Sequence, residues 1–155
     1  MTSTALDGRA RKTSSTFRME HSVGLPIAAP ATQVWALLTD ASGFPRWNRT
    51  VTSVAGDIRA GGKIAVRVPN VSRAFALAVR DFEAPRRMVW ASGAMPMFCG
   101  VRTFTLAERK DGCDFTMVEV FRGLMLPLIK GSLPDFGPMF ETYAADLKRE
   151  AETLA

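Results

Sequence analysis

The chain has 155 residues, 47% of them hydrophobic and 23% charged, which is typical of one globular domain with a sizeable buried core. Twenty Lys and Arg against fifteen Asp and Glu give a net charge of +5 at pH 7, which raises nucleic acid or an anionic surface as a partner. Two cysteines and one histidine exclude a disulfide framework and the common zinc spacings, so we expect neither a structural metal nor a cofactor.

The N-terminal residues differ in composition from the rest of the chain. They are rich in Ser and Thr and have little to bury, with Arg9, Arg11 and Lys12 against Asp7 as their only charges. We expect a disordered tail over residues 1–14 and a single domain over residues 15–155. The sequence shows neither a secretory signal nor an apolar run of about 18 residues, so we expect a cytoplasmic protein with no integral membrane association.

A strand and a short helix follow this tail. Apolar residues alternate with polar ones over residues 17–27, which predicts a half-buried strand with His21 on its apolar face. Residues 30–40 begin with a proline and continue with apolar residues at helical spacing, which predicts a short amphipathic helix. Trp35 and Trp47 are expected to be packing anchors beside this helix.

Six further strand-like runs, separated by short turns, predict an antiparallel meander. They cover residues 51–56, 63–69, 73–83, 87–92, 100–108 and 114–122. A terminal amphipathic helix is predicted over residues 136–154, with Asp146 and Lys148 among the charged residues mostly on its polar side. This order describes an α+β domain in which a seven-stranded antiparallel sheet curves around one long C-terminal helix. Because a single helix cannot fill such a sheet, we expect a cavity between them.

A series of short motifs runs through this predicted domain in a particular order. They are Pro26-Ile-Ala-Ala-Pro30, Val34-Trp35, Leu38-Thr39-Asp40, Phe44-Pro-Arg-Trp-Asn48, Gly61-Gly62, Val89-Trp90, Gly100, Phe104-Thr-Leu106, Asp111-Gly112, Glu119-Val-Phe-Arg-Gly123 and Asp146-Leu-Lys148. In this order and at these spacings, the chain resembles the START-like (SRPBCC, polyketide cyclase/dehydrase-type) family with the helix-grip fold over residues 15–155. The resemblance implies a lipid, polyketide or other small hydrophobic ligand between sheet and helix, and a minority of such proteins are cyclases or dehydratases.

The pairing of the last two strands decides which residues face the cavity. If the turn around residues 110–113 closes them as a hairpin, Phe104 lies opposite Glu119, and Arg102 is the diagonal neighbour of Glu119. Arg102 and Glu119 then stand on an apolar face, where an unpaired charge costs several kcal/mol. A structural ion pair is the favoured interpretation, and direct ligand contact or proton transfer is the alternative.

The helix-grip arrangement adds one more candidate to this pair. In it the first strand borders the last, which brings His21 toward Glu119. Glu119, Arg102 and His21 are therefore the candidate catalytic residues, although a lone histidine there is more often part of the core.

The candidate ligand-binding residues lie on the inner face of the sheet and on the terminal helix. They are Phe75, Leu77, Met88, Trp90, Phe98, Arg102, Phe104, Met117, Glu119, Phe121, Phe136 and Phe140. The alternative interpretation is an ordinary core with no space for a ligand.

An irregular apolar segment precedes the terminal helix. Residues 124–138 hold Gly131, Pro134, Gly137 and Pro138, which interrupt or kink any helix there. The segment is either a gate beside the pocket or a rigid corner.

Three classes of function follow from these patterns. Binding of a small hydrophobic molecule is favoured, and a polyketide cyclase/dehydratase-type enzyme is the alternative. A nucleic-acid module is disfavoured, because arginines such as Arg86 and Arg87 lie at turns and no aromatic residues are interleaved with them. We therefore expect a hydrophobic small molecule as the partner, no nucleic acid, and a monomer or homodimer.

Overall fold

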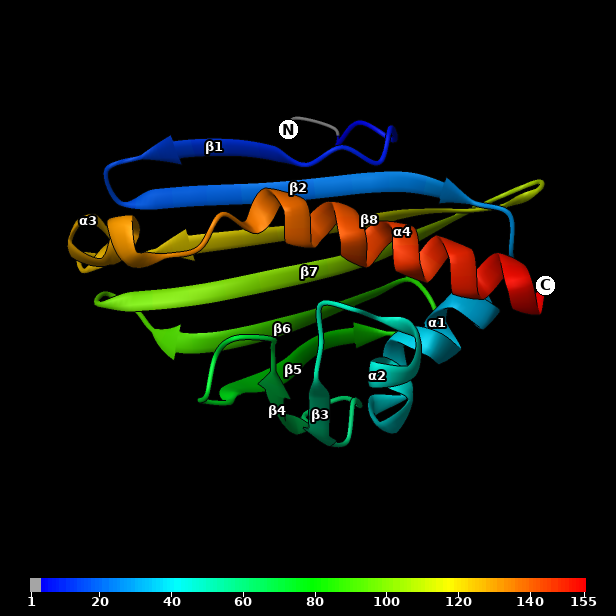
Figure 1. Cartoon of the computed structure of the whole chain (residues 1–155), viewed down its shortest axis with the longest axis horizontal. Helices are drawn as coiled ribbons and strands as arrows, with labels where there is room; N and C mark the ends of the chain where they lie inside the picture. Colours follow the sequence, from blue (N-terminus) through cyan, green and yellow to red (C-terminus); the bar gives the residue numbers. More distant parts are fainter. Residues whose placement is uncertain (1–3) are drawn as a thin grey trace.

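One curved antiparallel sheet wraps along a long C-terminal helix in the computed structural model, which describes residues 4–155 (Figure 1). The elements in chain order are β1 (Arg11–Ser15), β2 (Arg18–Ile27), α1 (Ala31–Thr39), η1 (Ala41–Gly43), α2 (Phe44–Trp47), β3 (Ser53–Gly56), β4 (Lys63–Arg67), β5 (Phe75–Glu83), β6 (Arg87–Ala94), β7 (Phe98–Arg109), β8 (Gly112–Arg122), α3 (Leu126–Ile129), η2 (Lys130–Ser132) and α4 (Phe136–Leu154). The strand order is β1-β2-β8-β7-β6-β5-β4-β3. The predicted α+β fold with a curved antiparallel sheet and a C-terminal helix is confirmed.

The sheet has eight strands, so the prediction of seven is wrong by one strand. The additional strand, β1, comes from the predicted disordered tail and pairs with β2 from Arg11 opposite Ser22 to Ser15 opposite Arg18. All five of its residues are exposed, so it buries little surface and covers an edge of β2 that would otherwise leave backbone groups unpaired. Alternation of apolar residues does not reveal such a strand. Residues 1–3 of the predicted tail lie outside the described residues.

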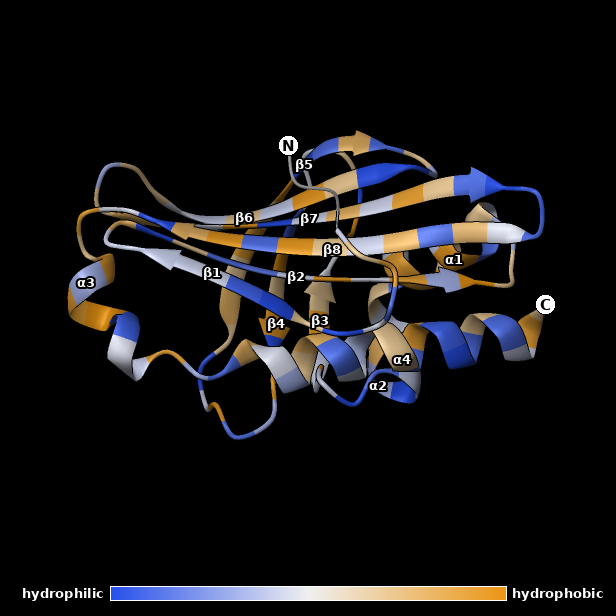
Figure 2. Cartoon of the chain, turned by 90° about the horizontal axis from the view of Figure 1, so that it is seen from above, coloured by the Kyte–Doolittle hydropathy of each residue, from blue (hydrophilic) through white to orange (hydrophobic). Residues whose placement is uncertain are grey.

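Helix α4 covers one face of the sheet, as Figure 2 shows from the side. Its first turn is capped by Asp135, whose carboxylate accepts a hydrogen bond from the Gly137 N–H at 3.0 Å. The residues of α4 buried against the rest of the domain recur at three- and four-residue spacing, and they are Phe140, Tyr143, Ala144, Asp146, Leu147 and Ala151. The main core therefore lies between this helix and the inner face of the sheet.

The β7–β8 hairpin differs from the predicted register by two residues. Arg109 pairs with Gly112 across a two-residue loop, so Arg102 lies directly opposite Glu119, and Phe104 lies opposite Met117. A shift of two keeps every side chain on its predicted face and turns the expected diagonal neighbours into direct ones. Gly112 has φ +151°, and a Cβ there would collide with the Ile27 carbonyl oxygen, so the glycine lets the hairpin approach the end of β2.

Candidate functional site

Five residues form one row across the sheet, each directly opposite the next. Lys12 of β1 pairs with His21 of β2, His21 with Glu119 of β8, Glu119 with Arg102 of β7, and Arg102 with Trp90 of β6. Directly opposed residues of antiparallel strands point to the same face. The three predicted catalytic candidates are therefore brought together as neighbours, on the face that α4 covers.

Arg102 and Glu119 form the ion pair that the sequence predicted. The Arg102 Nε and Nη2 both donate to Glu119 Oε2, at 2.9 and 2.6 Å. The two side chains are 20% and 14% exposed, so the pair is shielded from bulk solvent without being sealed from it. The guanidinium also lies over two rings of α4, 5.1 Å from the centroid of Phe140 and 5.9 Å from that of Tyr143.

His21 lies beside this pair in an apolar surrounding. It is 2% exposed, and its Nε2 has no hydrogen-bond partner. Its ring centroid lies 5.1 Å from that of Phe136 and 6.0 Å from that of Phe140. Burial lowers the pKa of His21 below its usual 6.5; the positive charge of Lys12 adds to this effect, and the negative charge of Glu119 opposes it. The imidazole is therefore neutral at pH 7.

Two further buried polar atoms near the pair lack a partner. Trp90 Nε1 and the Tyr143 hydroxyl make no hydrogen bond, and the two rings lie 4.7 and 6.1 Å from the ring of Phe104 between them. Burial raises the pKa of Tyr143, so its hydroxyl keeps its proton. Each buried polar atom left unpaired costs about 1–3 kcal/mol. Tyr143 lies within the predicted terminal helix, but a helical position does not reveal which strand residues a side chain meets.

The predicted ligand-binding residues lie in or against the core, with one exception. Met88, Trp90, Phe104, Met117, Phe121 and Phe140 are buried, and Leu77, Phe98 and Phe136 are partly buried and packed against the core clusters. Phe75 is 41% exposed, because it stands at the first position of β5. Most of the predicted ligand-binding residues therefore lie inside the domain.

Two hollows open on the surface, and neither is lined by these residues. The first, of about 320 Å³, lies among residues 28–31 and 108–112. The second, of about 550 Å³, lies among residues 15–18, 95–96 and 122–124. The aromatic side chains between the sheet and α4 pack against one another instead, for example Phe115 and Tyr143 with ring centroids 6.5 Å apart.

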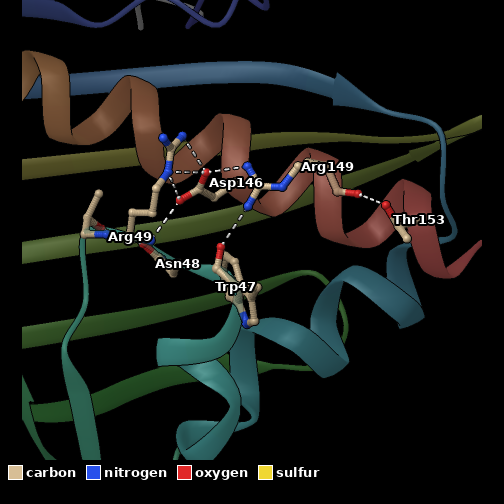
Figure 3. Close-up of polar contacts among 7 residues, drawn as sticks. Trp47, Asn48, Arg49, Asp146, Arg149 and Thr153 are labelled. Carbon is tan, nitrogen blue, oxygen red and sulfur yellow. Dashed lines mark hydrogen bonds and ion pairs between the residues drawn. The ribbon is translucent and has the colours of Figure 1, made fainter.

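A second polar cluster fixes α4 to the loop after α2 (Figure 3). Asp146 is fully buried and accepts hydrogen bonds from the Arg49 backbone N–H at 2.8 Å, the Arg49 guanidinium at 2.9 Å and Arg149 at 2.8 Å. Burial would raise the pKa of Asp146, but the hydrogen bonds from Arg49 and Arg149 outweigh it and hold the pKa below its usual value. The prediction that Asp146 lies on the solvent side is therefore wrong.

The Asp146 cluster positions an aromatic residue of the core. Arg149 donates to the Trp47 carbonyl oxygen at 3.2 Å, and the Trp47 ring stands edge-on to Tyr143 at 6.0 Å. Trp47 and Trp35 both lie in the core, as the sequence predicted. The cluster thus helps to set the position of Tyr143 beside Arg102.

No group of three or more His, Cys, Asp or Glu side chains among residues 4–155 is arranged to hold a metal ion. No helix in the same range is long and apolar enough to cross a membrane.

The curved sheet, the gripped helix and the inward-facing row define an α+β helix-grip protein. Over residues 16–155 the sequence matches the family described as polyketide cyclase / dehydrase and lipid transport, and the chain belongs to this family. The resemblance that the sequence motifs indicated is confirmed. No curated protein matches the sequence.

Solved structures with the same fold include proteins of known and unknown function. Norcoclaurine synthase from Thalictrum is 12% identical with a TM-score of 0.66, and the match covers 92% of this chain and 99% of that one. The di-domain aromatase/cyclase StfQ of steffimycin biosynthesis is 11% identical with a TM-score of 0.66, over 90% of this chain and 52% of that one. A conserved Enterococcus faecalis protein of unknown function is 14% identical with a TM-score of 0.66, over 94% and 78% of the two chains. At these identities the likeness is one of fold.

Proposed function

We propose that the chain binds a small hydrophobic molecule that carries a hydrogen-bond acceptor, between the inner face of the sheet and α4. The observation that carries this proposal is the set of unpartnered buried polar atoms around the Arg102–Glu119 pair, on His21, Trp90 and Tyr143. The indole N–H of Trp90 can only donate, and Arg102 has donors alone, so this set favours an oxygen acceptor on the ligand. The surrounding aromatic side chains favour an apolar body.

Entry of such a ligand requires the packed side chains to move. Phe136 lies at the start of α4. Its ring centroid is 5.3 Å from that of Phe121 and 5.1 Å from that of His21. Displacement of residues 124–138 carries Phe136 away from both rings, so in this proposal the segment is the gate. The family, described as including lipid transport, supports a binding role for the same region.

Removal of the Tyr143 hydroxyl tests the proposal without changing the shape of the core. The probe is the fluorescent anilinonaphthalene sulfonate, which has an apolar body and acceptor oxygens. A fluorescence titration measures its Kd, and native mass spectrometry measures how many probes bind each chain. We expect one probe per chain and a Kd raised about tenfold by Y143F, because a hydrogen bond to a charged group is worth about 1.5–3 kcal/mol. Thermal unfolding of Y143F is expected at or above the wild-type temperature, since an unpaired buried hydroxyl is lost.

Trp35→Phe is the matched control, since Trp35 is buried beside Phe82 and belongs to the packed core. W35F is expected to leave the Kd unchanged. No complex with the wild-type chain, or equal affinity for wild type, Y143F and Trp90→Phe, would contradict the proposal.

A proton-transfer enzyme of the cyclase/dehydratase type is the second candidate function. The observation in its favour is the position of the buried His21 directly opposite Glu119, which lies in turn opposite Arg102; burial lowers the pKa of His21 and so favours the neutral imidazole. A neutral imidazole can accept a proton from a carbon next to a carbonyl group, while Arg102 polarises that carbonyl and Glu119 orients Arg102.

Hydrogen exchange of a bound ketone tests this second function. With α-tetralone in deuterated water, we expect the chain to accelerate exchange of the hydrogens next to the carbonyl. His21→Gln is expected to abolish the acceleration and to leave binding of the ketone within a few-fold of wild type. Binding of the ketone with exchange no faster than in buffer excludes the enzyme interpretation for this class of substrate.

A further inference from the structure

Three separate chain segments meet at the end of the molecule opposite the C-terminus, the left end in Figures 1 and 2. The Gly123 N–H donates to the Phe17 carbonyl oxygen at 3.2 Å, which joins the β1–β2 turn to the end of β8. The N–H groups of Leu124 and Met125 donate to the carbonyl oxygens of Pro96 and Met97, both at 2.9 Å, which joins the same segment to the β6–β7 turn. We call residues 14–18, 94–98 and 121–134 together the loop end.

The close approach at the loop end is built into the sequence. Gly123 has φ +137°, and a Cβ there would collide with the Met97 carbonyl oxygen. Lys130 adds a further tie, because its Nζ donates to the Ser14 hydroxyl at 2.9 Å and to the Ser15 carbonyl oxygen at 2.6 Å. The loop end is therefore a defined surface formed by three turns.

Large apolar side chains stand exposed on each of the three segments. Their exposed fractions are 52% for Phe17, 59% for Met95, 52% for Met97, 56% for Leu124 and 76% for Leu128. The hollow of about 550 Å³ lies among them, lined by residues 15–18, 95–96 and 122–124. Exposed apolar side chains gathered at one site, in contrast to single ones, mark an interaction surface.

The charges of the loop end are all positive. Residues 14–18, 94–98 and 121–134 contain Arg18, Arg122 and Lys130 and no Asp or Glu. Arg18 also pairs with Glu20, which lies just beyond the loop end on β2, at 2.7 Å. Arg18 and Arg122 both line the hollow.

We propose that the loop end docks the protein onto an anionic lipid surface. Apolar side chains on protruding turns can enter the boundary between headgroups and acyl chains, while flanking cations attract negatively charged headgroups. A second copy of the chain fits the same surface poorly, because a two-fold contact would bring together two copies of a patch whose charges are all positive, and like charges repel. This proposal goes beyond the proposed function and does not depend on it.

Apolar contacts connect the loop end to the interior. Beneath the exposed side chains lies a small core of Met19, Phe121 and Leu126, against which Phe136 packs. Phe136 contacts Phe121 at 5.3 Å and His21 at 5.1 Å. A hydrophobic molecule leaving the bilayer at the loop end would therefore meet apolar side chains all the way to the Arg102 row.

Vesicle flotation of the full chain tests the proposal. The wild-type protein is mixed with vesicles of phosphatidylcholine alone, or with about a quarter of phosphatidylserine to supply a negative surface. We expect flotation with the anionic vesicles and much less with the neutral ones. Leu128→Asp is expected to lower the vesicle partition coefficient at least tenfold, and Arg122→Gln is expected to lower it about fivefold on anionic vesicles alone, since one basic residue near such a surface is worth about 1 kcal/mol.

Matched variants away from the loop end are the controls. Leu154→Asp replaces a leucine that is 55% exposed at the opposite end, and Arg86→Gln removes an exposed arginine from the β5–β6 turn. Both are expected to float as wild type does, and all variants are expected to unfold at the wild-type temperature.

Two results would overturn the proposal. One is wild-type protein that does not float with anionic vesicles. The other is flotation that L128D and R122Q leave unchanged. If native mass spectrometry instead shows a dimer that L128D dissociates, and no vesicles are bound, the loop end is an interface between copies of the chain. Because no interior ligand is present in these measurements, their failure leaves the binding proposal untouched.

Discussion

His21 is the single histidine of the chain, and it is buried with Nε2 unpartnered. Since burial lowers its pKa in the folded protein, the unfolded chain binds the proton more readily. The neutral imidazole thus contributes stability that is fully present above its usual pKa of 6.5 and is lost as the pH falls below it.

Proton NMR can follow this titration directly, because one histidine gives one set of imidazole signals. We expect a titration midpoint below 6.5 in the folded protein and a midpoint near the usual 6.5 in urea. A folded-state midpoint at or above 6.5 would contradict the burial of a neutral ring next to Phe136 and Phe140.

At the residue scale, sequence alone predicted that Arg102 and Glu119 face inward as an ion pair, but it did not predict the inward position of Asp146 or the unpartnered polar atoms around the pair. The inward positions of Arg102 and Glu119 follow from strand alternation, which a register error of two does not disturb. The unpartnered atoms of Trp90 and Tyr143 could not be predicted, because they depend on how a helix side chain meets three strands.

At the scale of elements, the Asp146 cluster holds α4 to the loop after α2. Asp146→Asn is expected to lower the free energy of unfolding by about 2 kcal/mol, because hydrogen bonds to a buried carboxylate become weaker ones to an amide. Since the pKa of Asp146 is lowered in the folded protein, this contribution is present above its usual 3.8 and is lost as the pH falls through the lowered value.

Chemical denaturation at pH 7 and at low pH measures the effect of D146N. Glu150→Gln is the matched control on the same helix, since Glu150 pairs with Arg46, whose side chain is 60% exposed. An exposed pair is worth at most about 1 kcal/mol, so E150Q is expected to cost less than D146N. Equal losses from the two variants would contradict a special role for the buried carboxylate.

Alternation and helical spacing predicted the positions of most strands and helices, but they did not predict strand β1 or the burial of Asp146. Strands and helices appear where alternation and helical spacing placed them, for example β5 over Phe75–Glu83 and α4 over Phe136–Leu154. Strand β1 was missed because its exposed residues have no apolar alternation. The burial of Asp146 was missed because a carboxylate at a polar helix position looks like a surface residue until its partner Arg49 is located.

At the scale of the whole molecule, a polar row inside the domain is connected to an exposed apolar region at one end. The interior row from His21 to Trp90 offers polar atoms within an aromatic core, and the loop end offers exposed apolar side chains together with Arg18, Arg122 and Lys130. Phe121 and Phe136 connect the two regions. Together they are consistent with both proposals, binding of a hydrophobic molecule beside the row and docking of the loop end onto an anionic lipid surface.

The central claim is that a ligand binds inside the domain beside Trp90. The chain has three tryptophans, so its indole N–H signals in a nitrogen-resolved NMR spectrum can be assigned with W35F, W47F and W90F. On titration with anilinonaphthalene sulfonate, we predict that the Trp90 signal shifts and saturates at one probe per chain, while the Trp35 signal stays in place. A bound probe that leaves the Trp90 signal unmoved would place binding elsewhere on the molecule and contradict the account.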